Sequence, residues 1–158
     1  MEPSRFVSVD PHLPITQETL EDWRQALAEV DAFFPSEDEL LLEETQVHPE
    51  RVLPRLATGR LRFIVFKQAA RGGILYDARE DRFHRWLGRA AKVIDPTGAG
   101  DAFAAGFLAG WLRGESVDVA LWRGVVGASF AIADWGAAGL LRADRAAAAD
   151  RLQAWRSS

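Results

Sequence analysis

The sequence predicts an α/β fold in which a parallel sheet is flanked by helices. Strand-like and helix-like segments alternate along the first half of the chain, which favours parallel strands joined by crossover helices. A glycine-rich turn at residues 98–100 then leads from a strand end into a long apolar helix. The 158 residues, 48% of them hydrophobic, are enough for one core, so we expect a single domain over residues 1–158.

Composition and charge exclude several classes of protein. The formal net charge of −4 does not favour nonspecific binding to nucleic acid. The chain has no cysteine, which excludes a disulfide framework and a thiolate metal site. Residues 1–5 lack the apolar core of a signal peptide, and the longest apolar run, residues 102–112, is far shorter than the roughly 20 residues that cross a bilayer. We therefore expect a cytoplasmic protein that binds neither nucleic acid nor membrane.

Short runs of β-branched and aromatic residues predict the strands, which cover residues 6–9, 30–34, 61–66, 74–76, 82–86 and 92–94. The strand at residues 74–76 should pair back onto the one before it, because Gly72 and Gly73 allow a turn between them. Residues 77–81 are polar and predict a loop.

Helix-start residues lie between these strands. Thr16 is a favoured N-cap residue and predicts a helix to about residue 29, with apolar residues at helical spacing. Ser36 is followed by three acidic residues, which are favourable in a first turn, and predicts a second helix. Pro49 begins a third helix, which should end near Gly59.

The second half of the chain is expected to be helical, with helices over residues 99–112, 116–133 and 143–155. Gly114 lies where a helix C-cap would end the first of them. Gly106 and Gly110 within that helix predict close packing against a strand.

The turn before the first of these helices contains the candidate catalytic residues. Gly98, Ala99 and Gly100 leave backbone N–H groups uncovered at a helix N-terminus, where anions bind readily. Asp101 follows directly, as the turn becomes helix. A carboxylate beside an anion site indicates a reaction in which a hydroxyl attacks a phosphate and the acid takes the proton.

The stretch V-I-D-P-T-G-A-G-D-A-F at residues 93–103, with Gly106, resembles the second signature of the ribokinase-like (PfkB) family of carbohydrate kinases, approximately D-x-T-G-A-G-D-x-F-x-x-G. Weaker similarity to that family runs through residues 7–11, 31–40, 64–76 and 127–137. The resemblance implies a three-layer ribokinase-like (Rossmann-like) sheet flanked by helices. It covers only the C-terminal portion of such kinases, so we expect this chain to lack the N-terminal substrate-binding half and the lid.

The resemblance also implies an activity, which is transfer of the γ-phosphoryl group of ATP to a hydroxyl of a sugar, polyol or nucleoside. Asp101 would be the catalytic base, and Gly98, Ala99 and Gly100 would form the anion hole. ATP and Mg²⁺ are the implied cofactors, with Glu39 acting at the magnesium site.

Further residues are assigned by position in the same resemblance. Asp95 and Thr97 fall where relatives that bind a monovalent cation such as K⁺ place ligands. Lys67, Gly72 and Ser129 fall near the nucleotide.

Three residues depart from the family pattern. Ser36 and Ser129 each stand where asparagine is usual, and Ala69 stands where glycine is usual. A second hypothesis therefore remains open, which is a catalytically silent nucleotide-binding or interaction module derived from such a kinase. Simpler readings also remain open: a helix cap for Asp101, an Asx turn for Asp95 and Thr97, a solvated acid for Glu39, a surface charge for Lys67 and packing for Ser129.

A sheet cut from such a kinase would expose a strand edge and apolar surface. We therefore expect a homo-oligomer, or a separate chain that supplies the N-terminal half.

Overall fold

The computed structural model describes residues 5–89 and 92–157. Contacts between Cα atoms divide the chain into two compact units, Met1–Leu87 and Gly88–Ser158, called unit 1 and unit 2 below. The single domain over residues 1–158 stays a prediction.

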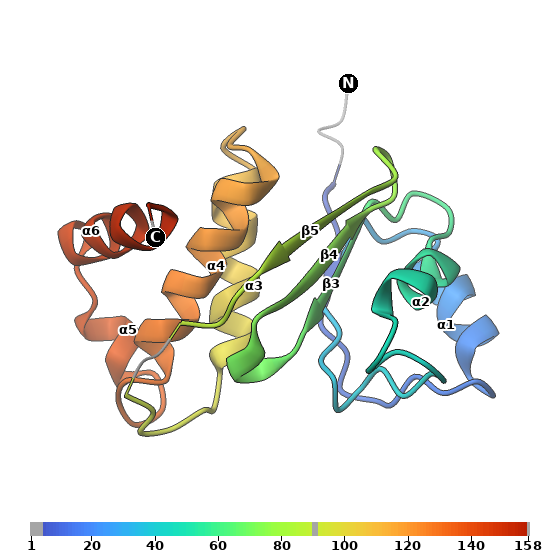
Figure 1. The fold of residues 1–158 in the computed structure, drawn as a ribbon, viewed down its shortest axis with the longest axis horizontal. Coiled ribbons are helices and arrows are strands. Elements are labelled where there is room, and N and C mark those ends of the chain that lie inside the picture. The colour runs from blue at the N-terminus through green and yellow to red at the C-terminus, as the bar shows by residue number, and fades with distance from the viewer. Residues whose placement is uncertain (1–4, 90–91, 158) are drawn as a thin grey trace. The chain divides into compact units, whose positions relative to one another are not determined.

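Unit 1 is a five-stranded sheet with helices. Its elements are β1 (Ser8–Val9), α1 (Leu20–Leu27), β2 (Ala32–Phe33), α2 (Pro49–Leu56), β3 (Phe63–Lys67), the 3₁₀ helix η1 (Ala69–Arg71), β4 (Gly73–Asp77) and β5 (Arg82–Trp86). The strands lie in sequence order, with β1, β2 and β3 parallel and β4 antiparallel to both of its neighbours (Figure 1). The predicted parallel strands and the strand that pairs back are therefore confirmed.

Strand alternation decides which side chains enter the core of unit 1. On β3, Ile64 and Phe66 face one side of the sheet, where they share a buried cluster with Leu27 of α1 and with Leu53 and Leu56 of α2. Both helices lie on that face (Figure 1). Tyr76 of β4 pairs with Ile64, so its side chain lies on the same face of the sheet.

Two helix starts predicted in unit 1 differ in the structure. Helix α1 begins at Leu20 and not after Thr16, because the Thr16 N–H donates to Thr19 Oγ1 in a local turn. The helix predicted after Ser36 is wrong. Ser36 forms a bridge with Lys67, and the Glu37 N–H donates to the Lys67 carbonyl, so this backbone continues the pairing of β2 with β3 instead.

The turn between β3 and β4 contains Ala69, one of the departures from the family pattern. Ala69 has a φ of 47° and Gly72 a φ of 95°, both in the left-handed region. A Cβ at such a position costs about 1–2 kcal/mol, which glycine avoids. Ala69 therefore carries strain at the position where glycine is usual.

Unit 2 contains the helices α3 (Ala99–Trp111), α4 (Val117–Ala131), α5 (Ala138–Arg142) and α6 (Arg145–Arg156). Ser116 caps α4 by accepting from the Val119 N–H, and Asp144 caps α6 by accepting from the Ala147 N–H. Helix α5 was not predicted. The strand predicted over residues 92–94 is absent, because the Ile94 N–H donates to the carbonyl of Ile132, after α4, rather than to a strand.

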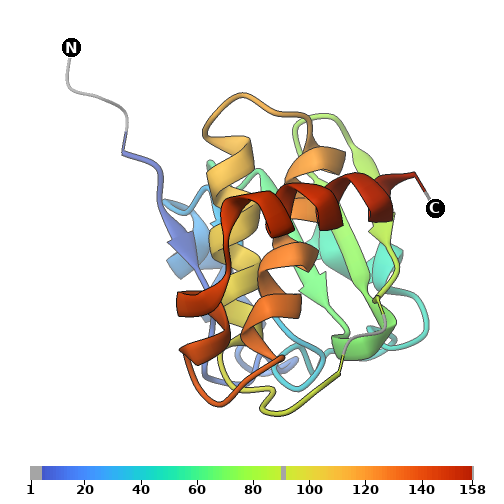
Figure 2. The same ribbon diagram turned by 90° about the vertical axis from the view of Figure 1, so that its left-hand side faces the viewer.

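Helices α3 and α4 pack with their backbones in contact, and α6 crosses them (Figure 2). A Cβ added at Gly106 would lie 2.5 Å from the Arg123 carbonyl oxygen, and one at Gly127 would lie 2.6 Å from that of Ala102. Gly106 therefore allows close packing against a helix and not against a strand. In the described residues, no helix is long and apolar enough to span a membrane.

We predict that Gly106→Ala lowers the free energy of unfolding by about 1–3 kcal/mol in urea titrations, because the added methyl forces the helices apart. Alanine is the better helix former by about 1 kcal/mol, so propensity alone gives the opposite sign. The control is Ala109→Gly at an exposed position of α3, which should lower stability by about 1 kcal/mol. A Gly106→Ala variant more stable than the wild type would contradict the close contact.

Candidate active site

The start of α3 has the geometry of an anion site. Gly98 is the N-cap residue with a φ of 77°, and a Cβ built there would meet no atom within 4 Å, so the turn is open. The N–H groups of Gly98, Gly100 and Asp101 donate to no backbone acceptor within residues 5–89 and 92–157. The Ala99 N–H donates to the Pro96 carbonyl at 3.2 Å. Free amides at the positive end of a helix attract anions.

Asp101 stands in the first turn of α3 with its side chain exposed. It provides no side-chain cap for this helix, and among the described residues it has no ion-pair partner. The simpler reading of a capping acid therefore lacks the hydrogen bond that it requires. The carboxylate is available to a molecule that binds at the turn.

The residue before this turn, Asp95, ties it to the segment after α4. Asp95 Oδ1 accepts from the Thr97 N–H at 2.9 Å, which makes an Asx turn, and Oδ2 accepts from the Gly136 N–H at 3.0 Å. Hydrogen bonds from Thr97, and then from the Gly136 N–H, lower the pKa of Asp95 from its ordinary value of 3.8. Asp95 therefore has a structural task here, and a cation at Asp95 and Thr97 stays a prediction.

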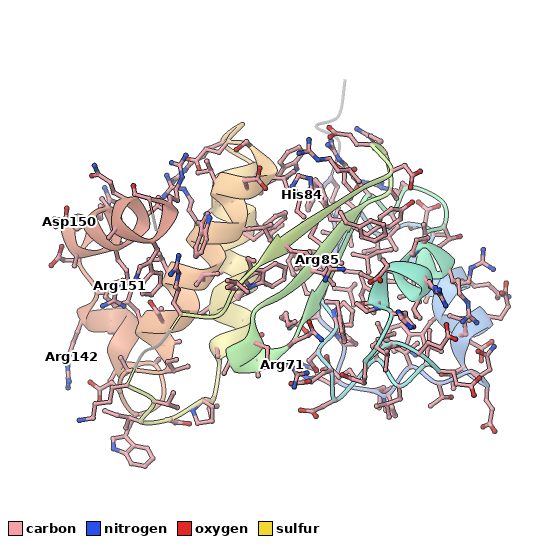
Figure 3. The ribbon with its side chains drawn as sticks, in the orientation of Figure 1. Arg71, His84, Arg85, Arg142, Asp150 and Arg151 are labelled. Carbon is pink, nitrogen blue, oxygen red and sulfur yellow. The ribbon has the colours of Figure 1, made fainter. Side chains whose placement is uncertain are left out.

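Ser129 is also engaged inside unit 2. Its buried hydroxyl donates to the Val126 carbonyl at 2.6 Å and accepts from Arg151 at 2.7 Å. The side chain of Arg151 extends from α6 to α4, where its guanidinium stacks over Phe130 with 4.0 Å to the ring centroid (Figure 3). The contacts favour packing of α6, and the nucleotide role of Ser129 stays a prediction.

In unit 1, polar residues gather at the carboxyl ends of the three parallel strands. Lys67 ends β3, and its Nζ donates to Asp10 Oδ2, just after β1, at 2.6 Å. The Lys67 side chain is only 14% exposed and β3 is the central strand, so Lys67 is not a solvated charge on an edge strand. Ligands of open α/β sheets bind outside the carboxyl ends of the strands.

Glu39 lies at the same end of the sheet, next to Ser36. Its Oε2 accepts from both the N–H and the hydroxyl of Ser36, each at 2.7 Å. Its Oε1 accepts no hydrogen bond among the described residues, so one oxygen can bind water or a cation. Gly72, by contrast, is buried in the turn before β4, where its N–H donates to the Ala69 carbonyl.

The described residues contain no cluster of three or more His, Asp or Glu side chains that could hold a metal ion alone. Mg²⁺ keeps several waters and is usually held by one or two carboxylates together with substrate phosphates. A single half-buried carboxylate such as Glu39 fits that way of binding.

Sequence reasoning missed three partners of the candidate residues. Asp10 holds Lys67, Gly136 closes on Asp95, and Arg151 holds Ser129. Only Asp10 had a signal in the sequence, because it follows a predicted strand and precedes a proline.

We predict that Asp95→Asn lowers the melting temperature near pH 7, because an amide nitrogen would face one of the two N–H groups that Asp95 accepts from. The pKa of Asp95 is lowered in the fold, so its stabilisation is present above pH 3.8 and is lost as the pH falls through the folded pKa. The difference from the wild type should therefore shrink below about pH 4. Asp150→Asn, at an exposed position of α6, is the control. If the melting temperatures of Asp95→Asn and the wild type differ equally at about pH 3 and at about pH 7, this account is refuted.

A comparison with known proteins finds a matching family and similar proteins. A family model described as pfkB family carbohydrate kinase matches residues 6–143. An acarbose 7(IV)-phosphotransferase from Actinoplanes sp. is 33% identical over 147 residues, which cover 88% of this chain and 46% of that protein. A cytidine kinase from Thermococcus kodakarensis is 31% identical over 114 residues, which cover 72% of this chain and 41% of that protein.

Solved structures show the same fold. The ribokinase of Arabidopsis thaliana, solved with ribose and ATP, matches with a TM-score of 0.74 and 22% identity over 94% of this chain and 47% of its own. The ribokinase-like fold expected from the sequence is therefore confirmed. The chain spans less than half the length of each of these three relatives.

Proposed function

Since this chain belongs to the pfkB family of carbohydrate kinases, we propose that it carries the phosphoryl-transfer end of an enzyme that phosphorylates a hydroxyl of a sugar or related small alcohol with ATP. The observation that carries the proposal is the turn before α3, where unused amides adjoin an exposed carboxylate without a cap hydrogen bond. A silent module would have no physical need for both. The relatives named as kinases of a nucleoside and of a sugar derivative support a sugar or a nucleoside as the acceptor, and a polyol is a further part of the proposal.

In the proposed reaction, Asp101 accepts the proton of the attacking hydroxyl. The hydroxyl oxygen forms a bond to the γ-phosphorus of ATP, the bond from that phosphorus to the bridging oxygen breaks, and ADP leaves. The amides of Gly98 and Gly100, with the helix dipole, stabilise the charge on the transferring phosphoryl oxygens. Ala99 contributes the backbone that connects them.

The proposed cofactors are ATP and Mg²⁺. Mg²⁺, when bound, neutralises charge on the phosphates. Glu39, with one oxygen free of hydrogen bonds among the described residues, would hold it through water. Lys67 and Gly72 would lie near the nucleotide, and a monovalent cation such as K⁺ at Asp95 and Thr97 is a further part of the proposal.

We predict that Asp101→Asn lowers turnover by at least about a hundredfold, because the amide cannot accept the hydroxyl proton. The assay is ADP release from ATP and Mg²⁺, with a panel of sugars, polyols and nucleosides, beside a thermal-shift measurement with ATP. The fold and the thermal shift should be kept, since Asp101 is exposed.

The matched control is Asp150→Asn, which removes another exposed helical carboxylate and should leave turnover unchanged. Full turnover in a folded Asp101→Asn variant would rule out the catalytic assignment. ATP binding by the wild type without turnover on any acceptor would favour the silent module.

We further propose that the outer edge of β1 pairs with another strand, from a second copy or from a segment supplying the N-terminal half. The bonds from β1 to β2 use the backbone of Val7 and Val9, which leaves the N–H and carbonyl of Ser8 facing outward. The opposite edge, β5, carries Arg82 and Arg85 on exposed positions, and such charges oppose edge pairing.

We predict that the chain sediments as a dimer or larger species, and that Ser8→Pro shifts it toward monomer by removing the outward N–H. Ser8→Ala keeps that N–H and should associate like the wild type. A wild-type monomer with high thermal stability in dilute solution would contradict the proposed pairing.

A further inference from the structure

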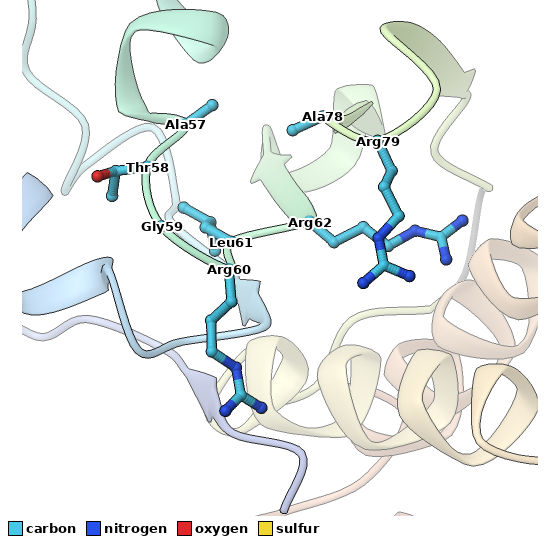
Figure 4. A pocket seen from close by; sticks show the side chains of 8 residues that line it. All are labelled: Ala57, Thr58, Gly59, Arg60, Leu61, Arg62, Ala78 and Arg79. Atoms are coloured by element: carbon cyan, nitrogen blue, oxygen red, sulfur yellow. The ribbon is translucent and has the colours of Figure 1, made fainter. Parts of the chain in front are cut away.

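A second candidate site lies in unit 1, at the opposite end of β3 from Lys67. The turn after α2 and the turn between β4 and β5 border an open hollow of about 350 Å³ (Figure 4). Pockets for small molecules span roughly 300–1,000 Å³. Its lining consists of Ala57, Thr58, Gly59, Arg60, Leu61, Arg62, Ala78 and Arg79.

The lining is strongly basic within an acidic protein. Three of its eight residues are arginines and none is an acid, although the chain has a net charge of −4. Arg60 and Arg62 come from the segment that leads into β3, and Arg79 from the turn after β4 (Figure 4). Arg62 and Arg79 therefore reach the hollow from two separate turns, whereas the Arg60 side chain points away from them, where it bonds to Asp31 (Figure 4).

Hydrogen bonds to neighbouring acids fix two of the arginines. Arg60 makes two hydrogen bonds to Asp31, at 2.9 and 2.5 Å, and Arg62 bonds to the fully buried carboxylate of Asp77 at 2.8 Å. Glu80, which is exposed, lies 3.5 Å from Arg62. These acids neutralise Arg60 and Arg62 and fix their positions, which lowers the ordering cost of binding a ligand.

Arg79 is the third arginine of the lining, and its positive charge is not paired with a carboxylate among the described residues. Its backbone N–H donates to Asp77 Oδ1 at 3.0 Å, so the buried acid that orients Arg62 also anchors the start of Arg79. Its exposed guanidinium has no carboxylate partner in the parts of the chain that the structure describes. The charge of Arg79 also acts on Asp31: burial raises the pKa of Asp31, but bonds from Arg60 and Val7 and the charges of Arg60 and Arg79 lower it overall.

Backbone donors complete the lining. The N–H groups of Thr58 and Gly59 donate to no acceptor among residues 5–89 and 92–157, whereas those of Arg60 and Leu61 donate to the carbonyls of Ala28 and Thr58. Ala57, Leu61 and Ala78 add an apolar wall. Planar guanidinium groups and turn amides together match the several oxygens of a phosphate better than a single carboxylate.

We propose that this hollow binds a phosphate dianion, either free or carried by a small monoester, with Arg79 as its principal charged contact. The hollow lies at the opposite end of β3 from Lys67, and the proposal does not rest on the proposed kinase function. The apolar wall and the volume favour the monoester over free phosphate.

The test is a ¹H–¹⁵N NMR titration of the chain with glycerol 2-phosphate and, separately, with inorganic phosphate, at constant ionic strength set with sodium chloride. We expect saturable shifts at the amides of Thr58, Gly59 and Arg79. Arg79→Gln should weaken that binding at least about tenfold, the loss expected for one charge-assisted hydrogen bond. Tighter binding of glycerol 2-phosphate identifies a monoester site, and equal affinities identify a free-phosphate site.

The matched control is Arg51→Gln, which removes an exposed arginine of α2 outside the hollow and should leave both affinities unchanged. Shifts at Gly98 and Gly100 alone, with none at Thr58 and Gly59, would overturn the proposal. So would an Arg79→Gln variant that is folded and binds both probes like the wild type.

Discussion

The backbone contact between α3 and α4 is the constraint on which the candidate catalytic turn depends. Gly127 admits the carbonyl of Ala102, the residue directly after Asp101, and Gly124 lies against the carbonyl of Phe103. The first turn of α3 therefore packs closely against the backbone of α4. The other end of the turn is held through Asp95, which bonds to Gly136 after α4. Helix α4 and the segment that follows it thus fix both sides of the turn, and its open amides are held in place before any anion arrives.

Much of the fold could be predicted from local sequence. The strand at Arg82–Trp86 appears with the predicted bounds, α3 begins at the predicted residue, and α4 begins one residue after its predicted start at residue 116. The failures have a common cause. Ser36 followed by three acids favours a helix in isolation, but its backbone is taken by pairing with Lys67. The same competition removed the strand expected over residues 92–94, where Ile94 bonds to Ile132 instead.

The candidate site was predictable in residue type but not in partners. The signature turn is local in sequence, so its residues and their order could be read directly. The contacts that decide what each residue is free to do join distant positions. Lys67 meets Asp10 across 57 residues, and Ser129 meets Arg151 across 22. Such pairs depend on strand order and helix packing, which a single sequence does not specify.

The central claim is that the amides of the turn before α3 bind the oxygens of the transferring phosphoryl group. The most direct measurement is a ¹H–¹⁵N NMR titration with ATP and Mg²⁺, using Gly98→Ala as the altered turn, since an alanine there is strained at a φ of 77°. The account predicts saturable shifts at the amides of Gly98, Gly100 and Asp101 in the wild type, and weaker binding in the variant. Saturable ATP binding that leaves these three amides unmoved would contradict it.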